Sequence, residues 1–159
     1  MPNTSALIGE SATAIARGEG ASDGALERCR AILATVGTVV EVAEAQLDAV
    51  TGLSGSGPAY IYYLVEVMMQ AGAAVGLDPQ LAKTLVLQTI KGAAQMLELT
   101  GADPTLLREQ VTSPGGTTHA GLTVLRDRGF QEALVACVAR ATERAGEMGA
   151  QLAATQRLG

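Results

Sequence analysis

One segment of this sequence, Leu81–Leu97, predicts a helix that is apolar on nearly every side. Its apolar residues cover more than one stripe of the helix surface: Leu85, Val86, Leu87, Ile90, Ala93, Ala94, Met96 and Leu97. Such a helix must be buried on most of its surface. The helical part of the chain, roughly 115 residues, can barely bury it alone. We therefore expect an obligate oligomer with helices interleaved across a two-fold axis. A well-buried central helix in a monomeric bundle is the alternative.

Three prolines in the second part of the chain mark the expected starts of helices. Pro79 and Pro104 each follow a capping aspartate, and Pro58 follows Ser56-Gly57. Proline is favoured at the first helical position, where its missing N–H has no partner to lose. The pattern predicts helices over residues 43–53, 58–75, 80–99, 105–111, 121–128 and 131–154. The segments SGSG (54–57) and TSPGGTTHAG (112–121) are expected to be loops.

The first forty-odd residues have a different pattern, typical of a β–α–β unit. Strands are expected over 11–17 and 38–42, the second being dense in β-branched residues. Between them, Ser22 or Asp23 can cap a helix over 25–36, and Gly37 ends it. The expected fold class is thus mainly α, with a small β–α–β element over residues 1–43 and a helical domain over residues 44–159.

Composition excludes several functions. The chain is 48% hydrophobic, carries a net charge of −5, and has a pI of about 4.8. Its Lys and Arg residues are scattered, which argues against nucleic-acid and anionic-membrane partners. Cys29 and Cys137 are far apart and His119 is the single histidine, so no metal site is expected. The N-terminus does not resemble a signal peptide, and the apolar segments are interrupted by charges. We expect a cytoplasmic protein.

The stretch GEGASDG (18–24) resembles a dinucleotide-binding loop between a strand and a helix, with Glu41 about twenty residues on. Three features count against that interpretation. The loop carries the acidic residues Glu19 and Asp23. The third glycine comes one residue later than in the dinucleotide-binding pattern G-x-G-x-x-G. A single pair of strands also cannot make the parallel sheet that supports such a site. The alternative that we favour is a Gly-rich turn before a capped helix.

The segment SPGGTTHAG (113–121) has no hydrophobic face and lies between two predicted helices. Pro114 restricts one backbone angle, and Gly115 and Gly116 free the next two. Thr117 and Thr118 then open a helix whose first N–H groups are unpaired, which suits a carboxylate or a phosphate. An elaborate helix cap without a ligand is the alternative. SGSGPAY (54–60) is a second small-residue loop of this kind, so the two together suggest a pocket.

These motifs, in this order, resemble the pyrroline-5-carboxylate reductase family. The resemblance rests on MPNT (1–4), TGLSGSGPAY (51–60) and VTSPGGTTHAGL (111–122), and it covers essentially the whole chain. It implies NADPH- or NADH-dependent reduction of 1-pyrroline-5-carboxylate to L-proline, the last step of proline biosynthesis. It also implies a helical dimerisation domain like the C-terminal domain of 6-phosphogluconate dehydrogenase, forming a homodimer or a larger homo-oligomer.

The resemblance also implies roles for individual residues. The substrate carboxylate would be held by one loop, comprising Val111, Ser113, Gly115, Gly116 and Thr117. Thr118 would place its hydroxyl against the ring nitrogen and is the expected catalytic residue. Pro2, Asn3, Ser56 and Gly57 would border the nicotinamide. A threonine suits this reaction, because it can hydrogen-bond the nitrogen without titrating as the imine becomes an amine.

Two residues depart from the family pattern. Ser5 stands where the family usually has proline after MPNT. His119 stands where an apolar residue is usual; it could face the site and titrate near neutral pH, or point to solvent.

By the same resemblance, a nucleotide-binding domain of roughly 100 residues should precede Met1. Residues 1–43 would be its last piece, with strands that pair with each other, pair across subunits or are poorly ordered. We expect the chain alone to be inactive. The rival interpretations are a non-catalytic oligomerisation module that binds a small carboxylate, and the helical half of a different nicotinamide-dependent reductase. Cofactor preference is left open, because the residues that read the ribose are not in this sequence.

Overall fold

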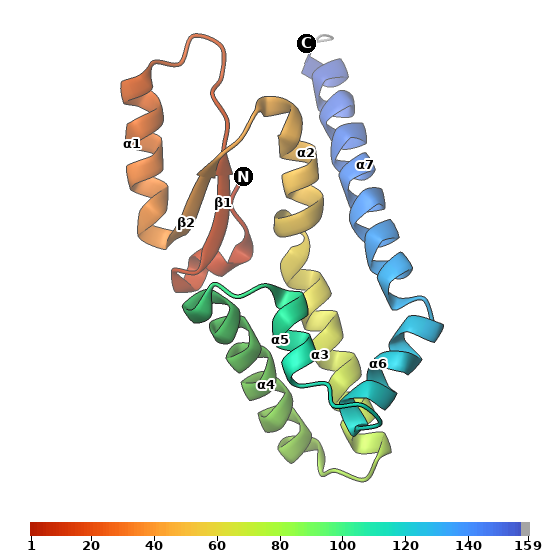
Figure 1. Cartoon of the computed structure of the whole chain (residues 1–159). Helices are drawn as coiled ribbons and strands as arrows, with labels where there is room; N and C mark the ends of the chain where they lie inside the picture. Colours follow the sequence, from red (N-terminus) through yellow and green to blue (C-terminus); the bar gives the residue numbers. More distant parts are fainter. Residues whose placement is uncertain (157–159) are drawn as a thin grey trace. The chain divides into compact units, whose positions relative to one another are not determined.

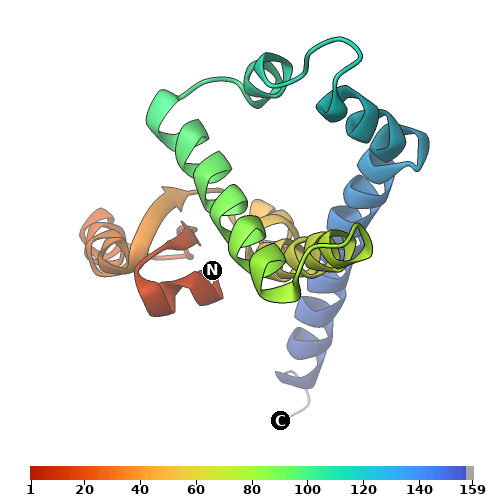
Figure 2. The ribbon, with the colours of Figure 1, turned by 90° about the horizontal axis from the view of Figure 1, so that it is seen from below.

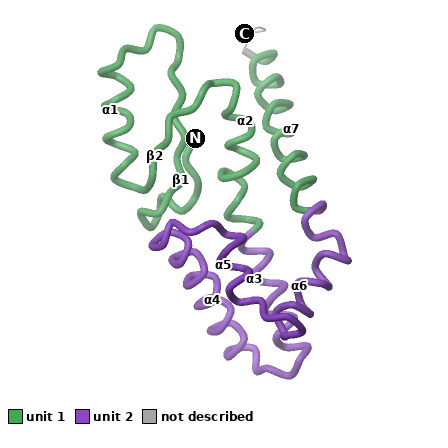
Figure 3. Tube along the Cα trace, viewed as in Figure 1, with its two compact units in different colours: residues 1–60, 134–159 green, residues 61–133 purple. Residues whose placement is uncertain are grey.

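The computed structural model describes residues 1–156 of the 159. The chain folds into two compact units (Figure 3). One unit comprises Met1–Tyr60 and the chain from Leu134 onward, and the other comprises Ile61–Ala133. Most of the described residues are helical, and the strands β1 (Ser11–Ile15) and β2 (Gly37–Glu41) form a two-stranded parallel sheet (Figure 1). The predicted fold class, mainly α with a β–α–β element, is confirmed.

The β–α–β element of the first unit consists of β1, α1 (Asp23–Leu33) and β2. The strands pair with each other, from Ser11 opposite Gly37 to Ile15 opposite Glu41, as one of our three alternatives predicted. Gly37 has φ +144°, and a Cβ there would collide with the backbone of Ser11. Glycine is therefore required where the two strands begin to pair.

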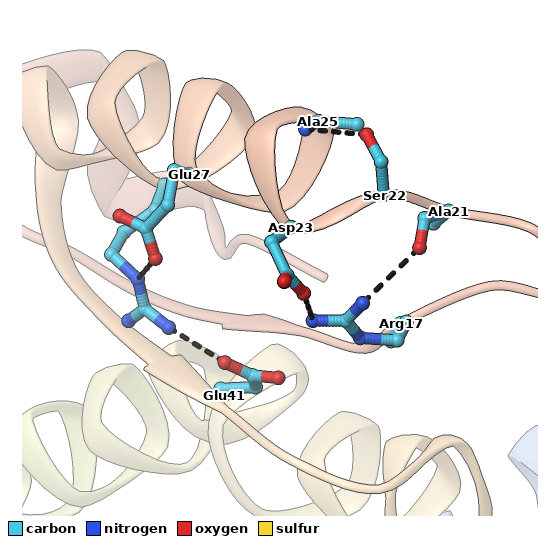
Figure 4. A network of polar contacts seen from close by, with 8 residues as sticks. Arg17, Ala21, Ser22, Asp23, Ala25, Glu27 and Glu41 are labelled. Carbon is cyan, nitrogen blue, oxygen red and sulfur yellow. Dashed lines mark hydrogen bonds and ion pairs between the residues drawn. The ribbon is translucent and has the colours of Figure 1, made fainter.

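Polar contacts tie α1 to the strands (Figure 4). Ser22 caps α1 by accepting the N–H of Ala25 at 3.2 Å, which was one of the two predicted caps. Arg17 pairs with Asp23 at 2.6 Å, and Arg30 on α1 pairs with Glu41 on β2 at 2.8 Å. The GEGASDG stretch is thus a turn into a helix whose N-terminus is capped by its own serine.

The same unit contains the chain from Glu44 to Tyr60 and most of α7 (Phe130–Gln156). We expected one helix to residue 53 and then a loop, and the structure differs. A 3₁₀ turn (Glu44–Gln46) leads into α2 (Leu47–Val50), then into a π-helical turn, Thr51–Gly55, and α3 (Gly57–Ala74) starts two residues later. SGSG is therefore not an open loop, because the chain stays helical through it.

Two glycines let α2 and the π-turn approach α7 closely. Gly52 is buried, and a Cβ there would collide with Thr142 Oγ1 and lie 2.9 Å from the carbonyl oxygen of Val138. Gly146 faces Asp48, whose Oδ2 would lie 3.2 Å from an added Cβ. The opposite side of α7 is polar, with Glu147 paired to Arg140 at 2.8 Å and to Arg144 at 2.7 Å.

The second unit contains the rest of α3 with α4 (Pro79–Thr100), α5 (Pro104–Gln110) and α6 (Thr117–Asp127). Asp78 and Asp103 cap α4 and α5 with Pro79 and Pro104 at their starts, so both predicted helix starts are confirmed. Figure 2 shows α5 between α4 and α6 along the chain, with an irregular segment on either side. α6 begins at Thr117, where the anion-binding interpretation expected a helix to open, and four residues before the helix predicted over 121–128.

Little of the second unit is buried. On α4 only Ala82 and Val86 are buried, and its large apolar residues on the remaining sides are exposed: Leu81, Leu85, Leu87, Met96 and Leu97. Within the described chain, the helix predicted to be apolar on most sides is thus buried along only one narrow face. Within residues 1–156, no helix has both the length and the apolar character needed to cross a membrane.

Candidate functional site

The predicted site residues fall into two groups, one in each unit. Pro2, Asn3, Ser56 and Gly57 lie in the first unit, and residues 111–118 lie in the second. We refer to them as the MPNT–SGSG group and the SPGGTT group.

In the MPNT–SGSG group, Asn3 connects two segments that are 51 residues apart. Its Nδ2 donates to the carbonyl oxygen of Ser54 at 3.1 Å, and its Oδ1 accepts the N–H of Ser5 at 3.2 Å. Both ends of the amide are thereby fixed, and Asn3 also caps the 3₁₀ turn Thr4–Ile8. Asn3 contacts Ser54, a residue of SGSG that was not among the predicted cofactor-bordering residues.

Buried hydroxyl groups hold the backbone of Asn3 in place. The N–H of Asn3 donates to Ser11 Oγ at 3.2 Å, and Ser11 Oγ lies 3.0 Å from Thr13 Oγ1. Both Ser11 and Thr13 are almost completely buried, at 2% and 1% exposure. Met1 adds an apolar contact, because its terminal methyl group lies against Gly55, 2.8 Å from where a Cβ would stand. β1 and the π-turn thus clamp MPNT from two sides.

The π-turn rearranges the hydrogen bonds around Ser56. The N–H of Ser56 donates to the carbonyl of Thr51, five residues back, at 2.8 Å. The carbonyl of Gly52 accepts instead from the hydroxyl of Tyr60 at 3.0 Å. Single π-turns inside α-helices are rare and are frequently found at functional sites. Sequence reasoning missed both Tyr60 and Ser11, because neither contact follows a local motif.

In the SPGGTT group, Ser113–Gly116 forms a tight turn that delivers the chain into α6. The N–H of Gly116 donates to the carbonyl of Ser113 at 3.0 Å, and Gly115 has φ +72°. Proline second and a positive-φ glycine third define a type II turn. A Cβ on Gly116 would collide with Ser113 Oγ, so the serine hydroxyl lies directly over this glycine.

The N-terminus of α6 is open. Gly116 is its N-cap residue, and no described side chain caps it, whereas Ser22, Asp78 and Asp103 cap α1, α4 and α5. The first backbone bond into α6 runs from Ala120 N–H to the carbonyl of Gly116 at 3.1 Å. The N–H groups of Thr117, Thr118 and His119 precede it and have no acceptor in the helix. Together with the helix dipole they favour an anion.

The side chains around this open end are accessible. Val111, Ser113, Thr117, Thr118 and His119 are all exposed in their unit. The hydroxyls of Ser113, Thr117 and Thr118 can each donate and accept. In the part of the chain that the structure describes, no cluster of three or more His, Cys, Asp or Glu side chains could hold a metal ion.

Comparison with known proteins shows which family has these features. A family model described as pyrroline-5-carboxylate reductase dimerisation matches residues 44–148. Pyrroline-5-carboxylate reductase 2 of Bacillus subtilis is 46% identical over 153 residues, covering 96% of this chain and 55% of that protein. The chain therefore belongs to the pyrroline-5-carboxylate reductase family, and it spans about half the length of the curated relatives it matches.

Solved structures of this family are also similar to the chain. The NADP-bound pyrroline carboxylate reductase of Plasmodium falciparum matches with a TM-score of 0.87 and 34% identity, over 94% of this chain and 60% of that one. The reductase of Coxiella burnetii also matches with a TM-score of 0.87 and 34% identity, over 92% of this chain and 55% of that one. The family resemblance seen in the sequence is confirmed, and the family's dimerisation domain supports homo-oligomerisation.

Proposed function

We propose that this chain is the substrate-binding and subunit-pairing part of a reductase that converts 1-pyrroline-5-carboxylate to L-proline with NADPH or NADH. One observation carries the proposal: the open N-terminus of α6, shaped by the Ser113–Gly116 turn, lies inside the segment that matches the reductase family. A ring that carries one carboxylate is a ligand suited to such a helix end.

The substrate carboxylate binds the N–H groups at the start of α6, with hydroxyls around it. Gly115 and Gly116 let the backbone come close to the ligand, and Ser113 and Thr117 supply hydroxyl donors. Val111, two residues before the turn, lies beside the ring. Because these donors are fixed by a turn and a helix, little ordering is needed when the ligand binds.

Thr118 hydrogen-bonds the ring nitrogen. In the reaction a hydride adds to the imine carbon, the electron pair of the C=N bond moves to nitrogen, and nitrogen gains a proton from water. A hydroxyl can donate to the imine nitrogen or accept from the amine without changing its own charge. Thr118 is exposed at the second position of α6, where a bound ring can reach it.

The MPNT–SGSG group borders the nicotinamide, which supplies the hydride when it is bound. A Cβ built on Gly57 would meet no atom within 4 Å, so a flat ring can lie against this backbone. Pro2 and Asn3, held between β1 and the π-turn, would border the ring together with Ser56 and Gly57. These contacts orient the ring, and they leave the phosphates to be bound elsewhere.

Residues 44–159 form the pairing and substrate-binding domain, and residues 1–43 belong to the nucleotide-binding domain. The exposed apolar sides of α4 are covered by a second copy of the chain, giving a homodimer or a larger assembly of dimers. The chain alone binds the carboxylate without measurable turnover, because α1 caps its own N-terminus with Ser22 and offers no cradle for a pyrophosphate.

Titration with L-proline, the reaction product, tests the proposal in this chain by backbone amide NMR. Shifts are expected at the Ser113–Thr118 amides, and pyrrolidine, the same ring without the carboxylate, is the control. No shifts with proline, or equal shifts with pyrrolidine, would refute carboxylate binding. For catalysis, a chimera that places the N-terminal half of the Bacillus subtilis relative before Met1 should reduce 1-pyrroline-5-carboxylate. An inactive, folded chimera would refute the reductase function and leave a carboxylate-binding oligomerisation module.

A further inference from the structure

The π-turn leaves one backbone carbonyl without its usual donor. In an α-helix the carbonyl of Gly52 would accept the N–H of Ser56, four residues on. Here the N–H of Ser56 is engaged one residue earlier, with Thr51 at 2.8 Å. The hydroxyl of Tyr60 donates to Gly52 in its place at 3.0 Å, reaching back eight residues. One phenol thus completes the hydrogen bonding of the shifted turn.

Gly52 is held on its other side by α7. Its backbone is buried against Thr142 and the carbonyl of Val138, so close that no Cβ fits. Because Gly52 cannot move toward α7, the bond from Tyr60 closes a nine-residue segment, Gly52–Tyr60, at a fixed length.

That closed segment contains the predicted cofactor-bordering residues. Ser54 is held from outside by Asn3, and Ser56 and Gly57 lie between Ser54 and Tyr60. Tyr60 is half-buried, whereas the two tyrosines that follow are exposed, Tyr62 at 64%. Asn3 therefore fixes the front of the segment and Tyr60 fixes its end.

We propose that Tyr60 is a positioning residue that, through its hydroxyl on the Gly52 carbonyl, sets the place of Ser56 and Gly57 beside the nicotinamide. The inference rests on the proposed reductase function for its catalytic consequence, and it stands on the geometry alone for the hold on the turn. Tyr60 touches neither substrate nor cofactor, and it acts through Gly52.

The substitution Tyr60→Phe tests this, because it removes one hydroxyl and keeps the ring. Tyr62→Phe is the matched control, since it removes the same group from an exposed position on the same helix. Amide hydrogen exchange of Ser56, measured in the chain itself, should become about 3- to 10-fold faster in Tyr60→Phe, as expected for one lost hydrogen bond. It should be unchanged in Tyr62→Phe. Unchanged exchange at Ser56 in folded Tyr60→Phe would overturn the hold on the turn.

The chimera described above provides the kinetic test. Tyr60→Phe should raise the KM for NADPH by about 3- to 10-fold and leave the KM for 1-pyrroline-5-carboxylate unchanged. General destabilisation would not separate the two constants in this way. Faster exchange with an unchanged cofactor KM would show that Tyr60 holds the turn but does not position the cofactor. An inactive unsubstituted chimera would reject the reductase function, and with it the positioning role, while the exchange result would still decide whether Tyr60 holds the turn.

Discussion

The side-chain amide of Asn3 donates to the carbonyl of Ser54, at 3.1 Å, at the position where Pro58 has no N–H to offer. In an α-helix that carbonyl would accept from residue 58, and proline lacks the donor. Asn3, 55 residues earlier, thus supplies the hydrogen-bond donor that Pro58 lacks. This relationship explains why two motifs that are distant in the sequence, MPNT and SGSGP, lie together in one unit.

A double-mutant cycle should detect this complementarity. Asn3→Ala removes the donor to Ser54, and the free energy of unfolding should fall by about 0.5–1.5 kcal/mol. Pro58→Ala restores a backbone N–H that can reach the same carbonyl, so Asn3→Ala should cost less in that background. Urea unfolding of the four proteins measures the coupling, which is expected to be at least about 0.5 kcal/mol. Equal costs in both backgrounds would show that the two residues act independently.

Gly52→Ala should be among the most damaging small substitutions in the first unit. The added methyl group would collide with Thr142 and lie 2.9 Å from the backbone of α7, which cannot yield as a flexible side chain would. We expect a loss of about 1–3 kcal/mol in the free energy of unfolding. Gly149→Ala on α7 is the control: nothing lies within 4 Å of its Cβ position, so it should stabilise by about 0.5–1 kcal/mol. Similar behaviour of the two variants would contradict the close packing at Gly52.

Much of the fold was predictable from local signals. The starts at Asp78-Pro79 and Asp103-Pro104 were predicted correctly, because the cap and the proline both act within one turn of the helix. At Pro58 the same rule correctly predicted a helix start, because α3 begins at Gly57, but the open loop expected before it was wrong. The chain instead continues through a π-turn, since a side chain from Asn3 supplies the hydrogen bond that proline cannot.

The candidate site was only partly predictable for a related reason. The turn at Ser113–Gly116 follows from Pro-Gly-Gly alone, and the open end of α6 follows from the lack of a capping side chain at Gly116. Tyr60 gave no sequence signal, because its hydroxyl contacts the carbonyl of Gly52, eight residues back, beside a π-turn that the sequence did not predict. Ser11 was missed because its role depends on where the strand β1 places it, beside Asn3.

The chain should be at least a dimer at micromolar concentration, because α4 exposes large apolar residues on most of its surface. Analytical ultracentrifugation should show a mass of two chains or more, and a compact, stable monomer would contradict this. Ile90→Glu should give unfolded or aggregated protein, since it places an unpaired charge within an apolar interface. Gln88→Glu, which adds the same charge at a polar position of α4, should remain folded and associated.

The phenol of Tyr60 should ionise at a higher pH than an ordinary tyrosine. Partial burial, with the neighbouring Cys137 thiol as a smaller cause, raises its pKa above the ordinary value of 10.0. Because the folded pKa is the higher one, the stability contributed by the neutral phenol is complete below pH 10 and is lost as pH rises through the folded value. Ultraviolet titration of phenolate should show a late component among the three tyrosines, absent in Tyr60→Phe. If Tyr60→Phe instead removed a component that ionises at lower pH than the others, the burial of this hydroxyl would be contradicted.

Thr118→Ala, made in the chimera with the Bacillus subtilis N-terminal half, should mainly reduce turnover. The substitution leaves the Ser113–Gly116 turn and the N–H groups of α6 in place, so carboxylate binding should persist. One unpaired group in the reacting complex costs about 1–3 kcal/mol, or roughly a factor of 5 to 150 in kcat. Gly116→Val should act differently, because its side chain would collide with Ser113 and distort the turn, so that substrate affinity falls together with turnover. Unchanged kinetics in Thr118→Ala would remove the threonine from its assigned role and make Ser113, whose hydroxyl lies over Gly116, the better candidate for the contact with the ring nitrogen.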